Sequence, residues 1–293
     1  MGKNNKLTRP DWIRAKVTPD HEFSGVKELL RAKKLNSVCV EAACPNKGEC
    51  WPKRHATFMV LGDTCTRNCS FCNVKKGIPL NVDREEPLRL SEAVKELGIR
   101  YAVITSVTRD DLKDRGAGHF AEVVRELKTM APDILVELLI PDMRADEELL
   151  EIVALSGADV IGHNIEMPRR LYCEVRPGSD YDISLGALKI LSALSADGER
   201  FKVKSAMMVG VGETDGEITE TLRDLKACGT DIVYIGQYLN PSQAHHPVRK
   251  YYTPDEFDSL KRQASAMGFA AVQSGPLVRS SYRAEESYLS LLK

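Results

Sequence analysis

Residues 58–72 read Phe58-Met-Val-Leu-Gly62-Asp-Thr-Cys65-Thr-Arg-Asn-Cys69-Ser-Phe71-Cys72, a short apolar run followed at once by three closely spaced cysteines. The apolar run predicts a buried strand. Working outward, similar runs recur at 101–107, 134–140, 159–165, 203–209 and 232–238. Between them lie segments whose apolar residues recur every three or four positions, as one helical face requires; these are 90–97, 119–130, 147–156, 184–194 and 217–228.

Six such strand-helix units predict an α/β fold with a parallel sheet covered by helices. Periodicity alone leaves two arrangements open, a doubly wound sheet and an incomplete barrel. The polar residues favour the barrel, because they cluster directly after the strands, for example at Thr105-Ser106 and Pro141-Asp142. A barrel gathers all of these loops around one mouth, whereas an open sheet brings only a few together. The expected fold is therefore a partial (β/α)6 barrel of the TIM type.

The parts of the chain outside this repeat are predicted to be extensions of the barrel. Residues 1–57 are polar and irregular, apart from a helix-like stretch at 26–34. The barrel itself is assigned to residues 58–240. Residues 241–293 then form a C-terminal extension, with a helix that is opened by Thr253 and has proline at its first position, and with an irregular tail.

Length and charge limit the classes of function. At 293 residues with 43% hydrophobic residues, the chain can bury a substantial core. Its 41 Lys and Arg nearly balance its 42 Asp and Glu, so no charge excess points to nucleic acid or to an anionic membrane. No signal peptide and no bilayer-spanning run is evident. We therefore expect a cytoplasmic protein, in which closely spaced cysteines are more often metal ligands or catalytic thiols than disulfides.

Most of the eight cysteines fall into two trios, which are Cys65, Cys69 and Cys72 and, upstream, Cys39, Cys44 and Cys50. Structural zinc usually has two pairs of cysteines, whereas each trio here is one ligand short. A loop with three cysteines fits a cubane iron-sulfur cluster whose fourth iron is open to an outside ligand. On spacing alone, a zinc site or a set of buried thiols stays an alternative, more so for the upstream trio. Cys173 and Cys228 lie outside both trios, and we expect no ligand role for them.

The pattern Cys65-x3-Cys69-x2-Cys72, with the aromatic Phe71 before the last cysteine, resembles the cluster signature of the radical S-adenosylmethionine enzymes. The upstream pattern Cys39-x4-Cys44-x5-Cys50, taken together with Arg279-Ser-Ser281-Tyr282, is similar to the lipoyl synthase family. Further runs carry the same resemblance, including His163-Asn-Ile-Glu166, Val175-Arg-Pro-Gly178, Gly210-Val-Gly-Glu-Thr214, Gly236-Gln-Tyr-Leu239 and His245-His-Pro247. Small departures occur at Thr108, Arg115 and Met167.

The resemblance implies an enzyme with two [4Fe-4S] clusters. The first, on Cys65, Cys69 and Cys72, would bind S-adenosylmethionine through its open iron and generate a 5'-deoxyadenosyl radical. The second, an auxiliary cluster on Cys39, Cys44 and Cys50 with the hydroxyl of Ser281 as fourth ligand, would be the sulfur source. Such an enzyme is a sulfurtransferase of lipoate biosynthesis that inserts sulfur at C6 and C8 of a protein-bound octanoyl-lysine.

The resemblance also implies contacts and partners. The expected cofactor contacts are Phe71, Asn164, Glu166, Arg176, Gly210, Gly212 and Glu213. The expected partners are octanoylated lipoyl carrier domains (2-oxoacid dehydrogenase E2 subunits and glycine cleavage H protein), a flavodoxin or ferredoxin as electron donor, and an iron-sulfur carrier protein. The His245-His246 pair is interpreted as a structured turn. Two alternatives stay open: a biotin synthase-like sulfur-inserting enzyme, and a non-catalytic zinc or iron-sulfur protein.

Overall fold

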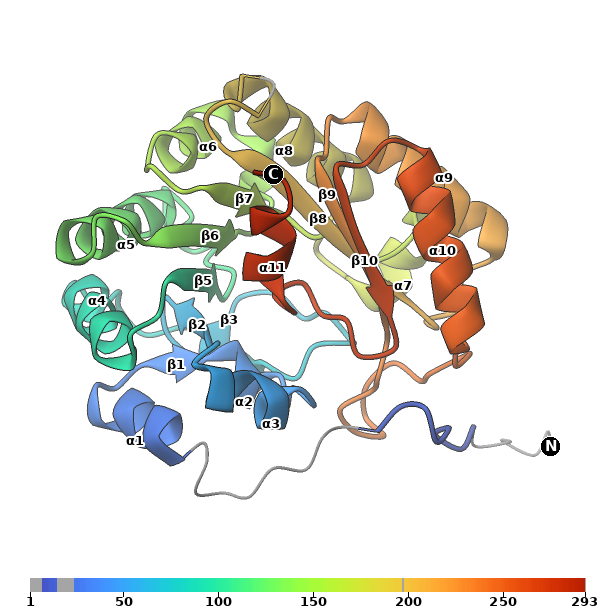
Figure 1. Ribbon diagram of the computed structural model, residues 1–293, viewed down its shortest axis with the longest axis horizontal. Helices are drawn as coiled ribbons and strands as arrows, with labels where there is room; N and C mark the ends of the chain where they lie inside the picture. Colours follow the sequence, from blue (N-terminus) through green and yellow to red (C-terminus); the bar gives the residue numbers. More distant parts are fainter. Residues whose placement is uncertain (1–6, 15–23, 197, 293) are drawn as a thin grey trace.

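The computed structural model describes residues 7–14, 24–196 and 198–292. They form one curved sheet of eight strands, in the order β1-β2-β5-β6-β7-β8-β9-β10 (Figure 1). All neighbours pair in parallel except β1 and β2, which are antiparallel. The strands are β1 (Asn36–Ser37), β2 (Thr57–Val60), β5 (Tyr101–Ser106), β6 (Leu135–Leu139), β7 (Val160–Gly162), β8 (Lys202–Val209), β9 (Ile232–Gln237) and β10 (Ala271–Gly275). Because β1 and β10 are opposite edges of this sheet, the barrel is open.

The helices cover the outer face of the sheet, and this confirms the predicted α/β partial barrel (Figure 1). They are α4 (Glu86–Leu97), α5 (Ala117–Met130), α6 (Glu147–Ala154), α8 (Tyr181–Leu194), α9 (Asp215–Ala227) and α10 (Pro254–Ala266). Each buries the face that its apolar spacing predicts; in α5, for example, Phe120, Val123 and Leu127 are buried. Several of these helices begin a few residues before the predicted start, because polar first turns carry no apolar signal.

The helix ends follow from local chemistry. Gly98 and Gly229 follow α4 and α9 with φ of 63° and 78°, a left-handed conformation that glycine adopts at little cost. At the start of α10, the Thr253 hydroxyl accepts from the Glu256 backbone N–H, and the Glu256 carboxylate accepts from the Thr253 N–H. This reciprocal pair confirms the predicted start of that helix.

The sheet continues past the predicted boundary at residue 240. Strand β10 pairs in parallel with β9 as a seventh parallel strand, and a final helix, α11 (Ala284–Leu289), lies against the inner side of the sheet (Figure 1). The irregular tail that the sequence predicts is therefore partly regular. Strand β10 contains Gln273 and Ser274, so it lacks the continuous apolar run that marks the other strands. Its residues are accordingly only half-buried.

The N-terminal extension contributes short helices beside β2. These are α1 (Ser24–Ala32), α2 (Val38–Glu41), α3 (Lys47–Cys50) and a 3-10 turn at Trp51–Lys53. Helix α1 matches the predicted helix-like stretch, and its Val26 and Leu30 join the main core. After β2, the strands β3 (Thr64–Cys65) and β4 (Lys75–Lys76) pair with each other. In the described parts of the chain, no helix is long and apolar enough to cross a membrane.

Candidate active site: two cysteine trios near strand β2

The first trio lies in a loop whose two ends are fastened together. Cys65 is the last residue of β3, and its carbonyl accepts from the Gly77 N–H directly after β4 at 3.0 Å. Within the loop, the Cys72 N–H donates to the Cys69 carbonyl at 3.3 Å. The Thr108 N–H points at the Cys65 sulfur at 3.3 Å. The predicted contact Phe71 is half-buried and packs against the main core.

A buried arginine between the first two cysteines fixes this loop to the barrel. Arg67 donates to both carboxylate oxygens of Asp110, at 2.8 and 3.0 Å, and to both of those of Asp142, one of them at 2.8 Å. These aspartates hold the pKa of Arg67 well above its usual range, although burial opposes them. Arg115 adds a bond to Asp110 at 3.4 Å. The role of Arg67 was not predicted from the sequence. The acidic residues that follow β5 and β6, Asp110 and Asp142, could have indicated that a basic partner is needed there.

Three predicted contacts gather beside Cys69. The Asn164 amide donates to Glu166 Oε1 at 3.0 Å, and Arg176 donates to the Asn164 carbonyl at 3.2 Å and to the Tyr172 hydroxyl at 2.9 Å. Burial raises the pKa of the Cys69 thiol, Arg176 lowers it and the Glu166 carboxylate raises it. Burial also raises the pKa of Glu166 itself. A half-buried carboxylate and a buried guanidinium therefore stand next to the loop of the first trio.

The predicted turn after β8 is organised by its own carboxylate. Glu213 accepts from the backbone N–H groups of Gly210, Val211 and Gly212 at 2.6, 2.9 and 2.9 Å. Gly210 has φ of 98°, and a Cβ there would lie 2.2 Å from the Gln237 Nε2. These glycines are thus required by the turn itself, and their contact with a cofactor stays a prediction. His246 joins the same region, because its Nε2 lies 2.8 Å from the Val211 carbonyl oxygen.

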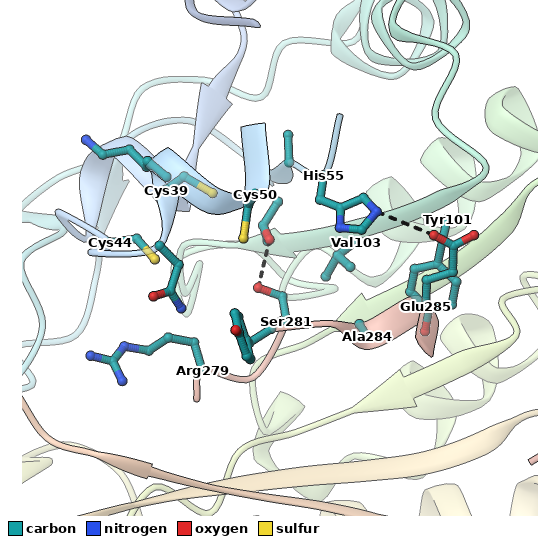
Figure 2. A pocket seen from close by; sticks show the side chains of 15 residues that line it. Cys39, Cys44, Cys50, His55, Tyr101, Val103, Arg279, Ser281, Ala284 and Glu285 are labelled. Carbon is teal, nitrogen blue, oxygen red and sulfur yellow. Dashed lines mark hydrogen bonds and ion pairs between the residues drawn. The ribbon is translucent and has the colours of Figure 1, made fainter. Parts of the chain in front are cut away.

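The second trio lines a pocket of about 520 Å³ of empty space, part of it open to solvent. Cys39 comes from α2, Cys44 from the following turn, and Cys50 from the end of α3. Figure 2 shows these thiols and the Ser281 hydroxyl around the same space. Arg279 lines it as well. The fold thus brings together the four residues that the resemblance implies as ligands, although Ser281 lies far from the cysteines in sequence.

Contacts between the two extensions hold the walls of this pocket together. The Thr57 hydroxyl donates to Ser281 Oγ at 2.9 Å, and the Asn46 amide donates to the Leu277 carbonyl at 2.7 Å. The Glu49 carboxylate accepts from the Tyr282 hydroxyl at 3.1 Å and from Arg283 at 3.2 Å. These partners were missed by sequence reasoning, because nothing in the sequence relates residues so far apart.

The donor set fits iron-sulfur clusters. All eight cysteines, which lie within the described ranges, are free. Burial raises the pKa of Cys50 to about 12 and that of Cys72 to about 11, so iron must displace thiol protons when it binds. Of the residues described, no group of three or more His, Cys, Asp and Glu could hold a single metal ion. A cubane cluster differs, because each cysteine binds a different iron and the sulfurs therefore stand apart.

Comparisons with known proteins show the superfamily and the fold. The profile of the Radical SAM superfamily matches residues 59–225, and the chain belongs to that superfamily. Among solved structures, methylornithine synthase has a TM-score of 0.56 at 15% identity, covering 92% of this chain and 83% of that one. The FeFe-hydrogenase maturase HydG from Carboxydothermus hydrogenoformans has a TM-score of 0.59 at 15% identity, covering 94% and 63%. At this low sequence identity, the similarity to these structures shows a shared fold only.

Closer relatives identify the family. The chain is 48% identical to lipoyl synthase from Caldicellulosiruptor saccharolyticus, over 95% of this chain and 97% of that protein. It is also 48% identical to lipoyl synthase from Delftia acidovorans, over 96% and 86%. The chain therefore belongs to the lipoyl synthase family, a family of radical S-adenosylmethionine enzymes.

Proposed function

We propose that this protein inserts two sulfur atoms, at C6 and C8, into an octanoyl chain held in amide linkage by a lysine of a lipoyl carrier domain. The observation that carries the proposal is the pocket of Cys39, Cys44, Cys50 and Ser281. It supplies a second thiolate site beside the loop common to the superfamily. Membership of the lipoyl synthase family supports the same activity.

In this proposal, Cys65, Cys69 and Cys72 hold a [4Fe-4S] cluster that leaves one iron for S-adenosylmethionine. When bound, that cluster supplies the electron that cleaves the cofactor's carbon-sulfur bond. Arg67 holds the loop in place against Asp110 and Asp142, so the three thiolates keep a fixed relation to the sheet. Orientation of the cofactor and exclusion of water are the protein's contribution.

The charged pair beside Cys69 is suited to binding the cofactor. S-adenosylmethionine carries a carboxylate, an amino group and a sulfonium. The Arg176 guanidinium can pair with an anionic group, and the Glu166 carboxylate can accept hydrogen bonds or face a cation. Asn164 orients Glu166 through the 3.0 Å bond between their side chains. We assign Phe71, Gly210 and Gly212 to the same site as backbone and apolar walls, with Glu213 holding the turn together.

Cys39, Cys44 and Cys50, together with Ser281, would hold the auxiliary [4Fe-4S] cluster. When bound, this cluster supplies the sulfur atoms and is consumed. Ser281 must lose its hydroxyl proton to act as a ligand, and the Thr57 hydroxyl, which donates to Ser281 Oγ, favours the resulting anion. An alkoxide is a harder ligand than a thiolate, so it is the ligand best suited to be released when iron leaves the site.

We assign the three parts of the chain separate tasks. Residues 1–57 and 241–293 build the auxiliary site, and residues 58–240 build the site for radical generation. A flavodoxin or ferredoxin would supply electrons, and an iron-sulfur carrier protein would rebuild the consumed cluster. The octanoyl substrate would be presented by 2-oxoacid dehydrogenase E2 subunits or glycine cleavage H protein. A cytoplasmic location, where thiols stay reduced, suits this chemistry.

Mass spectrometry of an octanoylated lipoyl-domain peptide tests the proposal. The peptide is incubated anaerobically with reconstituted protein, reductant and S-adenosylmethionine. We expect a lipoyl peptide that carries both sulfur atoms, with 5'-deoxyadenosine as the co-product. Formation of 5'-deoxyadenosine without any sulfur in the peptide would contradict the proposed substrate.

A further inference from the structure

The inner face of strand β9 contacts the C-terminal tail at two points. Tyr234 and Gly236 are two positions apart in β9 and therefore lie on the same side of the strand. Tyr234 shares a cluster of buried side chains with Val278 of the tail. No catalytic step described above uses either residue of β9, and both meet the segment that carries Ser281.

The first contact is a close approach of two backbones. A Cβ built on Gly236 would lie 2.2 Å from the carbonyl oxygen of Val278 and 3.1 Å from its carbonyl carbon. Real Cβ atoms do not approach a backbone oxygen so closely, so any larger residue at 236 must displace the tail. The φ of Gly236 lies outside the left-handed region, and β9 itself therefore tolerates a side chain there. Glycine is needed here for the neighbour rather than for the strand.

The second contact fixes the tail beyond Ser281. The Tyr234 hydroxyl lies 2.7 Å from Ser287 Oγ in helix α11, and the Gln273 amide of β10 donates to the same oxygen at 3.0 Å. Tyr234 is itself buried and held by Lys204, whose ammonium group lies 4.0 Å from the centre of its ring. The hydroxyl that contacts α11 therefore belongs to a buried and packed side chain.

Ser281 lies between these two contacts, in a tight turn. The Tyr282 N–H donates to the Arg279 carbonyl at 2.9 Å, and Arg279 donates to the Gln237 carbonyl of β9 at 3.2 Å. A shift at Val278 is carried through this turn to the serine three residues on. The tail has less freedom to absorb the shift before Val278, because the Asn46 amide donates to the Leu277 carbonyl.

We propose that Gly236 and Tyr234 are positioning residues that set the Ser281 hydroxyl against Cys39, Cys44 and Cys50. This inference rests on the proposed function, in which Ser281 is the fourth ligand of the auxiliary cluster. In this arrangement, strand β9 supports the C-terminal extension, and the N-terminal extension contacts the same tail through Asn46.

The test compares Gly236→Ala and Ser281→Ala with the parent in a background that lacks the radical trio (Cys65→Ala, Cys69→Ala and Cys72→Ala). The reconstituted auxiliary cluster is followed by Mössbauer spectroscopy, which resolves the iron bound to oxygen. We expect Gly236→Ala to lose the oxygen-bound iron site, as Ser281→Ala does. In the metal-free protein, amide exchange in the Val278 to Tyr282 turn should rise on the order of tenfold.

Two further variants make the test specific. Gly275→Ala is the matched control, because its added methyl would meet only the Val278 Cγ2, at 3.3 Å, which can rotate away. We expect the parent spectrum from it. Tyr234→Phe removes one hydroxyl and keeps the ring, so it decides the question if Gly236→Ala does not fold. We expect faster amide exchange in α11 and a weakened oxygen-bound site.

The outcomes distinguish the positioning role of Gly236 and Tyr234 from the ligand role of Ser281. A parent spectrum and parent exchange in both β9 variants, with an altered spectrum in Ser281→Ala, would overturn the positioning role and leave the serine ligand intact. Equal loss in Gly275→Ala would show that the carbonyl contact at Gly236 has no special part, which also overturns the inference. A parent spectrum in Ser281→Ala would remove the serine from the proposed function, and the inference would fall with it.

Discussion

Thr57 joins the sheet directly to Ser281, because its hydroxyl, on β2, donates to Ser281 Oγ at 2.9 Å. The Thr57 side chain is buried and Ser281 is half-buried, so the bond is shielded from water on the side of the sheet. A single hydroxyl is thus placed to favour the ionised form of the serine. The same atom is a sensitive point at which to perturb the auxiliary site.

We expect Thr57→Val to slow sulfur insertion roughly ten- to a hundredfold, since a hydrogen bond to a charged group contributes about 1.5–3 kcal/mol. The shape of the side chain is kept and only the donor is lost. The rate of lipoyl-peptide formation is measured together with the rate of 5'-deoxyadenosine release. Thr221→Val is the matched control, because it removes a buried hydroxyl bond of 2.8 Å on the outer helix α9. Equal slowing in both variants would contradict the local role of Thr57.

The two trios should separate into two activities at the level of single thiols. Cys65→Ala is expected to abolish cleavage of S-adenosylmethionine, because the open-iron cluster loses a ligand. Cys44→Ala is expected to leave that cleavage intact and to stop sulfur insertion. Quantifying 5'-deoxyadenosine and lipoyl peptide in the same reaction checks both. Persistent cleavage in Cys65→Ala, or lipoyl product from Cys44→Ala, would show that the roles are assigned wrongly.

At the scale of elements, the start of helix α9 is held by charge. The Thr214 hydroxyl and the Glu217 carboxylate form a reciprocal cap, and Arg170 donates to both oxygens of Glu217 at 2.6 and 3.0 Å. The bond from Arg170 is the main reason why the pKa of Glu217 falls from its ordinary 4.5 to about 2. The negative charge also suits the N-terminal end of the helix.

A Glu217→Gln variant should therefore lose stability in a pH-dependent way. Since the folded pKa is depressed, the extra stability of the parent is present above pH 4.5 and is lost as the pH falls towards 2. We expect the parent to exceed the variant by up to about 1 kcal/mol in free energy of unfolding at pH 7. The difference should shrink between pH 4.5 and pH 2.5 in denaturant unfolding curves. A difference that does not change with pH would contradict the ion pair.

The sequence predicts those elements whose signal lies within the element itself, and it does not predict contacts between segments that are far apart in the chain. The six strands and their outer helices were predictable, because apolar spacing is local and the strands are buried on both faces. Strand β10 was not, since Gln273 and Ser274 break its apolar run and its place is set by backbone pairing with β9. The trios were predictable from spacing. The bonds from Thr57 to Ser281 and from Arg67 to Asp142 were not, because their partners come from distant segments.

At the scale of the whole molecule, the two cysteine trios predict the iron content. Anaerobic reconstitution should give about eight irons and matching sulfide per chain. Replacing all three cysteines of either trio with alanine should reduce this to about four, because the sites share no ligand. Iron and sulfide assays with visible absorbance spectra provide the measurement. Tightly bound zinc without visible absorbance would contradict both clusters.

The contact between Asn46 and Leu277 joins residues 231 positions apart, and the sheet that lies between them must be largely formed before they can meet. Closing so long a loop early would cost conformational entropy with no strands in place to repay it. We therefore expect the auxiliary pocket to be completed late in folding, after β2 and β9 are in the sheet. The rate at which Cys39, Cys44 and Cys50 become able to bind iron would then report on the last stage of refolding.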